Sequence, residues 1–310
     1  MNESSRIFLS VLIPVFNEEL IVEECVKRLS AVAQKTGPYE LVFINDGSGD
    51  RTLELLLNEK KKNPSIKILN FSRNFGHQAA ITAGMEHAQG EIAVIIDADL
   101  QDPPEMIPEM IRKWKEGYDV VHGRRKRRMG ETIFKTWTAA FFYRLLGKIS
   151  NVSIPVDVGD FRLLSKRALQ ALIKLREHHR YLRGLVAWLG YKQTFVEYIR
   201  DERFAGETKF SLMKTIKFSI DGISSFSILP LRLSTFVGFF SSGFSFLYIF
   251  YALYAKFVLH DVVPGWTAVV IGVFFLGGVQ LICLGIMGEY IGMLHEESKA
   301  RPLYLISEIY

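Results

Sequence analysis

Along residues 7–123 the chain repeats one pattern, in which a short, β-branched apolar run leads through a turn into a longer amphipathic stretch. This alternation predicts strand–helix units and therefore a parallel sheet in an α/β fold. Because the apolar runs lack a polar face, we expect helices on both sides of the sheet. The predicted strands are Leu9–Val15, Glu40–Asn45, Ile66–Asn70, Ile92–Asp97 and Asp119–Gly123. The predicted helices are Glu19–Gln34, Thr52–Lys62, His77–Ala88 and Pro104–Trp114.

Two later stretches carry no charged residue, Leu233 to Ala255 and Val262 to Gly288. As helices rising about 1.5 Å per residue, both are long enough for a hydrocarbon layer of about 30 Å. Two buried core helices are the alternative, but they would need a large protein around them. The pattern therefore predicts two membrane spans. Lys and Arg flank the two spans and are absent from the connection 257–264, which predicts that both ends lie in the cytoplasm.

A shorter amphipathic stretch precedes the first span. Its apolar positions recur at helical spacing and share one face: Met213, Ile216, Ile220 and Ile223. Such a helix either lies in the headgroup layer of a membrane or packs as an ordinary helix. In the second span, Gly277, Gly278 and Gly285 permit close helix contact, within one chain or in a homo-oligomer.

Composition narrows the class of protein only slightly. The 310 residues include 38 Lys and Arg against 33 Asp and Glu, a net charge of +5. Cys25 and Cys283 fall in a predicted helix and a predicted span without a CxxC motif, which argues against disulfides and zinc. The basic cluster 124–128 has the chemistry for nucleic acid, anionic lipid or a phosphate-bearing substrate. Neither a P-loop nor GxGxxG follows the first strand, which argues against an ATPase or a dehydrogenase.

Polar residues follow several of the predicted strands. In a parallel sheet they would converge at the carboxyl ends of the strands, where ligands bind. The fourth strand runs into Asp97 and Asp99, and Gln101 adds a third oxygen ligand nearby. Hard oxygen ligands suit Mg²⁺ or Mn²⁺ shared with a diphosphate. A lone pair of aspartates also occurs in turns and caps, but the polar cluster from other strands favours metal-assisted use of a nucleotide.

Two further polar residues stand at the same predicted edge. Asp46 either caps the helix that begins near Thr52, shapes the Asp-Gly turn, or accepts a hydrogen bond from a ribose hydroxyl or a base N–H. His77 stands near the start of the third helix without a second histidine at metal spacing. We expect it to be an exposed or capping residue.

The motifs, taken in order, are 11–19 (VLIPVFNEE), 44–48 (INDGS), 72–76 (SRNFG), 97–105 (DADLQDPPE), 158–163 (VGDFRL), 203–209 (RFAGETK) and 288–292 (GEYIG). This set resembles the family 2 glycosyltransferases, and more closely their polyprenyl-phosphate branch. That branch includes dolichyl-phosphate mannose synthases and the bactoprenol (undecaprenyl-phosphate) glucosyltransferases. The resemblance covers nearly the whole chain.

The resemblance implies a Rossmann-like GT-A domain and assigns roles residue by residue. The nucleotide sugar would contact Pro14, Phe16, Glu18, Asp46, Asp97, Ala98 and Asp99. The metal ligands would be Asp97, Asp99 and Gln101. The acceptor phosphate would contact Arg125, Arg162, Arg203 and Lys209. A planar guanidinium grips phosphate oxygens in pairs, which supports the arginines; a solvated patch that attracts lipid headgroups is the alternative.

Asp160 matches the position that resembles the catalytic base of the bacterial glucosyltransferases. Its Gly-Asp-Phe-Arg context departs from the Ser-Gly-Phe-Arg of mannose synthases, which favours the bactoprenol type. A phosphate monoester with a second pKa of about 6 is mostly dianionic at neutral pH and hardly needs a base. Asp160 is therefore a base, a residue that positions Arg162 or the acceptor, or a turn carboxylate paired with Arg162.

The resulting expectation is an enzyme of the cell's inner membrane. Residues 1–202 form a cytoplasmic glycosyltransferase domain, 203–232 a basic loop and amphipathic helix, 233–290 two spans and 291–310 a cytoplasmic tail. We expect it to transfer a sugar, most simply glucose from UDP-glucose, to undecaprenyl phosphate with inversion. The expected cofactor is Mg²⁺ or Mn²⁺, and no nucleic-acid partner is expected. The alternatives are a glycosyltransferase that extends a growing glycan and a non-catalytic membrane subunit that recruits headgroups or partners.

Overall fold

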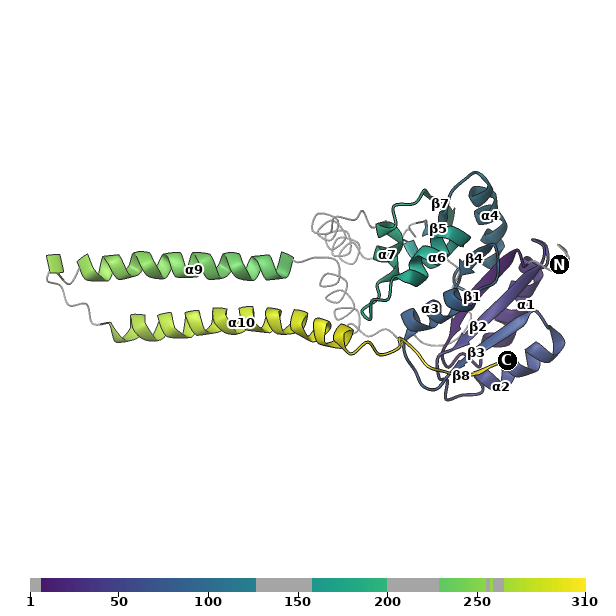
Figure 1. Cartoon of the computed structure of the whole chain (residues 1–310), viewed down its shortest axis with the longest axis horizontal. Helices are drawn as coiled ribbons and strands as arrows, with labels where there is room; N and C mark the ends of the chain where they lie inside the picture. The colour runs from purple at the N-terminus through teal and green to yellow at the C-terminus, as the bar shows by residue number, and fades with distance from the viewer. Residues whose placement is uncertain (1–6, 127–157, 200–228, 255–256, 259–264) are drawn as a thin grey trace. The chain divides into compact units, whose positions relative to one another are not determined.

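The computed structural model describes residues 7–126, 158–199, 229–254, 257–258 and 265–310 (Figure 1). The described residues form two compact units. A globular unit contains the residues up to 199 together with 301–310, and a helical unit contains those from 229 to 300. Arg203, Lys209 and the expected amphipathic helix over 213–223 lie outside the described residues.

The globular unit is built on a sheet whose described strands have the order β7-β5-β6-β4-β1-β2-β3-β8. Strands β1 to β4 pair in parallel, as predicted. However, β6 runs antiparallel to both β4 and β5, and β8 runs antiparallel to β3, so the sheet is mixed outside the predicted parallel part. The strands are β1 (Leu9–Val15), β2 (Tyr39–Asn45), β3 (Ile66–Phe71), β4 (Ile92–Ile95), β5 (Val120–Arg125), β6 (Val158–Ser165), β7 (Gln193–Tyr198) and β8 (Ile306–Ile309).

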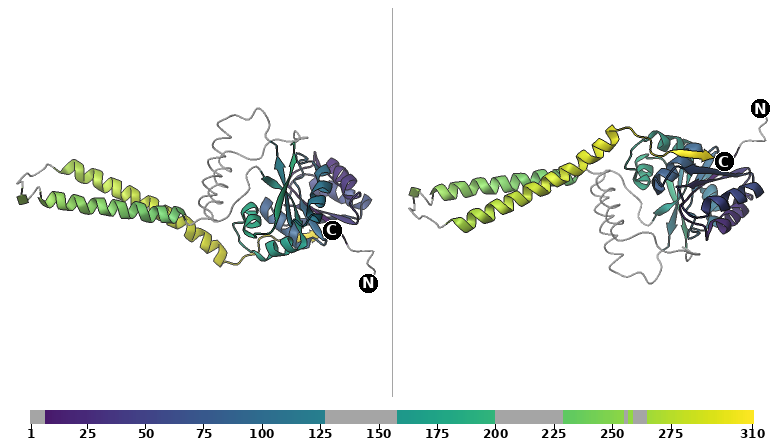
Figure 2. Two further views of the ribbon diagram at one scale, coloured as in Figure 1. Left: turned by 90° about the horizontal axis from the view of Figure 1, so that it is seen from above. Right: turned by 90° about the horizontal axis from the view of Figure 1, so that it is seen from below.

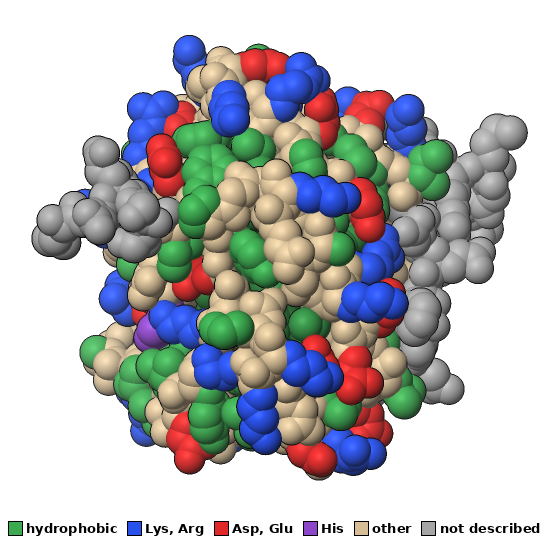
Figure 3. Space-filling view, turned by 90° about the vertical axis from the view of Figure 1, so that its right-hand side faces the viewer, with side chains coloured by type: hydrophobic (Ala, Val, Ile, Leu, Met, Phe, Trp, Pro, Cys, Tyr) green, Lys and Arg blue, Asp and Glu red, His purple; other side chains and the backbone are tan. Residues whose placement is uncertain are grey.

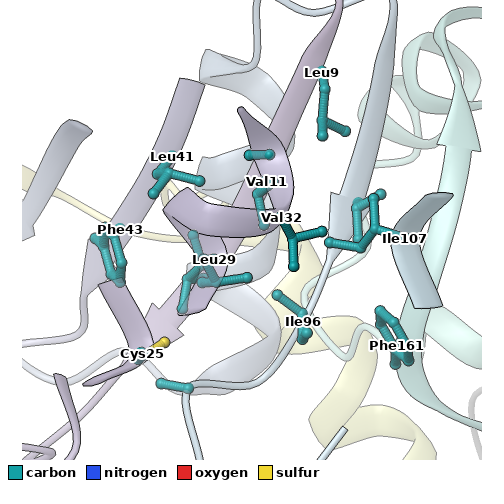
Figure 4. Close-up of a cluster of buried hydrophobic side chains, with 14 of the residues drawn as sticks. Leu9, Val11, Cys25, Leu29, Val32, Leu41, Phe43, Ile96, Ile107 and Phe161 are labelled. Atoms are coloured by element: carbon teal, nitrogen blue, oxygen red, sulfur yellow. The ribbon is translucent and has the colours of Figure 1, made fainter. Parts of the chain in front are cut away.

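The helices of the globular unit cover both faces of the sheet. They are α1 (Val22–Ala33), α2 (Thr52–Lys62), α3 (His77–His87), α4 (Ile107–Lys115), α6 (Lys166–Lys174) and α7 (Leu182–Trp188), with a short 3-10 turn, η2 (Pro104–Met106). On one face Leu9 and Val11 of β1 pack with Leu29 of α1 and Ile107 of α4 (Figure 4). This face excludes water because the helices present their apolar stripes to it.

Helix α3 lies on the opposite face, and a glycine sets how closely it approaches. A Cβ at Gly84 would lie 2.9 Å from Ile44 Cδ1 and 3.4 Å from Leu12 Cβ. Only a residue without a side chain therefore lets α3 lie at this distance from β1 and β2. The position of α3 matters because its first residue, His77, reaches the carboxyl ends of the strands.

Strand β6 is buried along its whole length although it carries Asp160 and Arg162. These two charged residues interrupt the apolar run, so the sequence pattern does not predict a strand here. Its antiparallel course between β4 and β5 places the start of β6 beside the carboxyl end of β4, with Ile95 opposite Arg162. Residues from two distant parts of the chain thus meet at one edge of the sheet.

The helical unit consists of α9 (Leu229–Tyr254) and α10 (Trp266–Ser298), which lie side by side in both views of Figure 2. The Cys283 Sγ contacts the Ser234 carbonyl oxygen at 3.7 Å. Segments Leu229–Tyr251 and Ile271–Ser298 have mean hydropathies of 1.5 and 2.1 and are long and apolar enough to cross a membrane. Their large side chains are exposed, Phe239 by 76% and Phe274 by 77%. These values suit helices that face lipid rather than water.

The segment 291–310, which we expected to be a cytoplasmic tail, contributes to two elements of the structure. Helix α10 continues to Ser298, and residues 306–309 form β8 on the edge of the sheet in the globular unit.

The surface of the globular unit seen in Figure 3 mixes Lys and Arg with Asp and Glu and carries scattered apolar side chains. This pattern is ordinary for a solvent-exposed surface.

Candidate active site

The carboxyl ends of β1, β2, β4 and β5 and the start of β6 form one edge of the sheet. The loops after β1 and β2 are tied together there, because the Asn17 N–H donates to Ser48 Oγ at 3.0 Å and the Gly49 N–H donates to Asn17 Oδ1 at 2.8 Å. Asn17 adopts a φ of 53°, in the left-handed region. Such backbone strain is typical of functional sites. Pro14 is buried at this edge, whereas Phe16 is 36% exposed.

Strand β4 ends at Ile95, two residues before the predicted end at Asp97, so both Asp97 and Asp99 stand in the turn beyond the strand. The Gln101 N–H donates to Asp99 Oδ1 at 3.2 Å, and Leu100 has a φ of 56°. Ala98 is only 4% exposed. The turn is thus a defined structure that brings two carboxylates to the edge.

Asp97 has a buried oxygen that forms no hydrogen bond within the described part of the chain. Its Oδ1 is buried without a hydrogen-bond partner among the described residues and lies 3.5 Å from His77 Nε2. Burial raises the pKa of Asp97 to about 6, helped by the negative charges of Asp160, Asp102 and Asp99 and opposed by His77. An unsatisfied buried carboxylate oxygen among other carboxylates suits a cation.

The donor set fits a hard divalent cation. Among the described residues, no three His, Cys, Asp or Glu side chains lie close enough to form a complete metal site. Mg²⁺, however, is usually held by one or two carboxylates, with water and substrate phosphate completing its shell. Asp97 and Asp99 supply ligands of that kind.

Asp160 is surrounded by positive charge. Its Oδ1 lies 3.1 Å from Arg162 Nη2 and 3.2 Å from Arg183 Nε, and its Oδ2 lies 3.5 Å from His77 Nε2. Burial by itself raises the pKa of Asp160, but Arg183, His77 and Arg162 outweigh it and hold this pKa well below its usual range. A carboxylate in this setting is a weak base, so the geometry favours a positioning role for Asp160.

Arg162 is only 1% exposed. Its Nε and Nη2 donate within β6, whereas its Nη1 is buried without a hydrogen-bond partner among the described residues. It donates to the Gly159 carbonyl at 2.9 Å and to the Asp160 carbonyl at 3.2 Å. This placement favours a role in orienting Asp160 over the phosphate contact that the resemblance implies.

His77 bridges the two carboxylates, a contact that the sequence did not predict. Its side chain is 41% exposed, as expected for an exposed residue, but α3 has no side-chain cap hydrogen bond. Burial lowers the pKa of His77, but Asp160 and Asp97 outweigh it and raise the pKa to about 9. His77 is therefore a cation at neutral pH between Asp97 and Asp160.

Asp46 braces the loop between β3 and α3 instead of capping α2. The Phe75 N–H donates to its Oδ1 at 2.7 Å, and the Gly76 N–H and Asn74 Nδ2 both donate to its Oδ2 at 3.0 Å. The start of α2 is served by Asp50, whose Oδ1 accepts from the Thr52 N–H at 3.0 Å. The capping alternative for Asp46 is therefore wrong.

Arg125 is held at the end of β5 by a buried pair. Its Nη2 lies 3.5 Å from Asp102 Oδ1, and its Nε donates to Tyr198 Oη at 3.2 Å. Tyr198 also donates to Asp102, which is 1% exposed. A Cβ at Gly159 would lie 2.9 Å from Arg125 Nη2, so the glycine leaves room for the guanidinium.

The structure thus brings together Asp97, Asp99, Asp160 and Arg162 and adds His77 and Arg183. Arg183 lies on α7, and no motif marked it in the sequence. His77 directly follows the 72–76 motif, and that position was the only available signal for it.

Comparison with known proteins defines the class. Residues 10–173 match the family model of glycosyl transferase family 2. An uncharacterized glycosyltransferase of Bacillus subtilis (strain 168) is 50% identical, covering 99% of this chain and 95% of the relative. A bactoprenol glucosyl transferase of Shigella phage SfV is 41% identical, covering 96% of this chain and 97% of the relative. The chain belongs to glycosyltransferase family 2 and is an enzyme of that class.

Solved structures confirm the fold. Glucosyl-3-phosphoglycerate synthase from Mycobacterium tuberculosis in complex with UDP has a TM-score of 0.50 at 18% identity, covering 71% of this chain and 78% of that chain. A crystal structure of the same enzyme with Mn²⁺, UDP-glucose and phosphoglyceric acid also has a TM-score of 0.50, at 19% identity. The mixed α/β sheet is therefore of the GT-A type.

The charge on His77 predicts a pH dependence of stability. The folded protein binds the His77 proton more tightly than the unfolded chain does. Protonation of His77 therefore stabilises the fold fully below pH 6.5, and this contribution is lost as the pH rises through about 9. We expect the thermal midpoint in detergent to fall over that range and His77→Gln to flatten the fall. His87→Gln, at the other end of α3, is the control and should behave as wild type. An equal fall in the His77→Gln variant would contradict the assignment.

Proposed function

We propose that the protein transfers glucose from UDP-glucose to a polyprenyl phosphate, with undecaprenyl phosphate as the acceptor and inversion at the anomeric carbon. The observation that carries the proposal is the meeting of Asp97, with its unsatisfied oxygen, and Asp160 at one edge of a GT-A sheet. The name of the Shigella phage relative, a bactoprenol glucosyl transferase, supports this sugar and this acceptor.

At the donor end, Asp97 and Asp99 would hold a Mg²⁺ or Mn²⁺ ion, with Gln101 close by in the same turn. A divalent cation at this place offsets the charge that develops on the departing diphosphate. Asp46 carries three N–H donors on two oxygens, which leaves acceptor capacity for one further donor from the nucleoside. Pro14, Phe16 and Glu18 would line the nucleoside at the end of β1.

At the acceptor end, a phosphate oxygen of the lipid attacks the anomeric carbon, and the bond from that carbon to the UDP oxygen breaks with its electron pair. Arg125, aimed by Asp102 and Tyr198, would bind the acceptor phosphate together with Arg203 and Lys209. Because the acceptor is already ionised, Asp160 needs only to orient the groups around it.

The sheet and the two apolar helices support one arrangement in the membrane. Strand β8 follows α10 in the chain and pairs with β3, which precedes α9. Two segments in one sheet lie on the same side of a membrane, so the intervening chain crosses it an even number of times. This supports an enzyme anchored by a helical hairpin; the positive residues around the spans favour the cytoplasmic side of the inner membrane.

Removal of the metal tests the donor half of the proposal. Full-length enzyme in detergent should transfer labelled glucose from UDP-glucose to undecaprenyl phosphate. EDTA should abolish transfer and excess Mn²⁺ or Mg²⁺ should restore it. Asp97→Asn should lower the rate by at least about 100-fold, because the metal loses a charged ligand. Glu54→Gln, an exposed residue of α2, is the control.

Transfer that is insensitive to EDTA and to Asp97→Asn would remove the metal from the proposal. No transfer from any UDP or GDP sugar to any lipid phosphate would remove the reaction itself.

The role of Asp160 is separable by pH. If Asp160 is a positioning residue, the substitution Asp160→Asn should lower kcat by about 100-fold, because misplaced groups react slowly. Raising the pH until the acceptor is fully ionised should not restore the rate. Recovery at high pH would instead identify Asp160 as the base, and the rate profile of both proteins from about pH 6 to about pH 9 decides between the two roles.

A further inference from the structure

The C-terminal segment 301–310 makes contacts that the proposed reaction does not explain. The Ile68 N–H donates to the Tyr310 carbonyl at 3.0 Å, the Tyr310 N–H to the Ile68 carbonyl at 2.9 Å, and the Ser72 N–H to the Leu305 carbonyl at 3.1 Å. The segment therefore continues the sheet beyond β3. Most of it stays exposed, Ile309 by 53% and Leu305 by 53%, so apolar burial alone does not hold it.

Tyr304, one of several half-buried residues of this segment, joins it to β3 and α3. Its ring stacks on Phe71 with the centroids 5.1 Å apart and the planes 10° from parallel. Its hydroxyl donates to the Glu86 carboxylate, which also pairs with Arg176 at 3.0 Å. Burial and the bond to Glu86 raise the pKa of Tyr304 well above its usual range, so the hydroxyl keeps its proton and donates at physiological pH.

The two partners of Tyr304 lie on either side of the loop that binds Asp46. Phe71 is the last residue of β3, directly before the loop 72–76. Glu86 lies near the far end of α3, the helix that begins directly after this loop. Phe71 also packs edge-on against Phe75 at 5.7 Å, and the Arg73 guanidinium lies 4.0 Å from the Phe75 ring centroid. Tyr304 thus contacts β3 and α3, the two elements that the loop connects. It also contacts the loop indirectly, because Phe71 lies between Tyr304 and Phe75.

The hydrogen bonds of Asp46 depend on the conformation of this loop. Two of the donors to Asp46 are the backbone N–H groups of Phe75 and Gly76, and Gly76 has a φ of 98°. Backbone donors point correctly only while the loop keeps its conformation. A change in the packing of Phe71 or in the position of α3 therefore alters the hydrogen bonds of a carboxylate that is 3% exposed.

We propose that Tyr304 is a positioning residue of the nucleotide site, and that the segment 301–310 sets the affinity of the enzyme for its nucleotide sugar through the loop 72–76. The inference rests on the proposed function, in which Asp46 contacts the nucleoside. It goes beyond that function by assigning a role in donor binding to a segment that follows both apolar helices in the chain.

The test measures donor binding separately from catalysis. Full-length Tyr304→Ala should weaken UDP binding and raise the KM for UDP-glucose by about 3- to 30-fold, the range found for residues that act through a neighbour. The kcat at saturating donor and the KM for undecaprenyl phosphate should stay near wild type. Loss of folded protein alone would lower kcat and leave the KM for UDP-glucose unchanged, so the two effects are distinguishable.

A series of variants separates the ring from the hydroxyl. Tyr304→Phe keeps the stacking on Phe71 and loses the bond to Glu86, so its donor KM should lie between those of wild type and Tyr304→Ala. Glu308→Gln is the matched control, because Glu308 is an exposed residue of β8 whose carboxylate accepts a hydrogen bond from the Tyr310 hydroxyl, and the substitution keeps the backbone pairing with Asn70. It should have the wild-type KM for UDP-glucose.

Three results would overturn the inference: wild-type UDP affinity and donor KM in Tyr304→Ala, a fall in kcat with an unchanged donor KM, or an equal rise in KM in Glu308→Gln. Failure of the wild-type enzyme to bind UDP or UDP-glucose at all would instead count against the proposed function. Titration calorimetry with UDP on the unmodified enzyme is therefore the first measurement.

Discussion

Compensation of buried charge is the constraint on which the site depends. Strand β6 carries Asp160 into the interior between β4 and β5, and an ionised carboxylate there is tolerated only with partners. Arg162, Arg183 and His77 provide them, and each would be costly to lose because the others would be left unbalanced. The same cluster leaves Asp97 incompletely satisfied. Asp160 is thereby held in its charged form, and in the proposed function Asp97 would bind a divalent cation.

The two carboxylates illustrate how one fold separates chemical roles. The pKa of Asp160 is held down by its cations, whereas that of Asp97 is raised to about 6 by burial. Neighbouring groups whose pKa values are driven apart are typical of catalytic sites. In the proposed function, Asp160 would orient the groups around it and Asp97 would take part in binding the charged donor.

Much of this arrangement was predictable from the sequence, and the failures have physical causes. The β1 and α2 boundaries match the predictions because local apolar periodicity determines both. The polar residues from Asp97 to Gln101 were predicted at the end of the fourth strand because that strand is a buried apolar run, although the strand ends two residues earlier than predicted. Strand β6 was missed because Asp160 and Arg162 interrupt its apolar pattern. The strands beside which β6 lies are also set by pairing between distant segments of the chain, and no local sequence pattern encodes that pairing. His77 and Arg183 were missed for that second reason, since only the folded sheet brings them to Asp160.

Strand β8 has a consequence for the order in which the protein is made. Tyr304 and its partner Glu86 are 218 positions apart, and both apolar helices are translated between them. During synthesis the outer edge of β3 therefore has no β8 to pair with until the chain beyond α10 has left the ribosome. An unpaired edge strand is a template for association with other chains. A nascent chain that stalls within either helix would leave that edge open, and the risk of aggregation ends only when the final strand arrives.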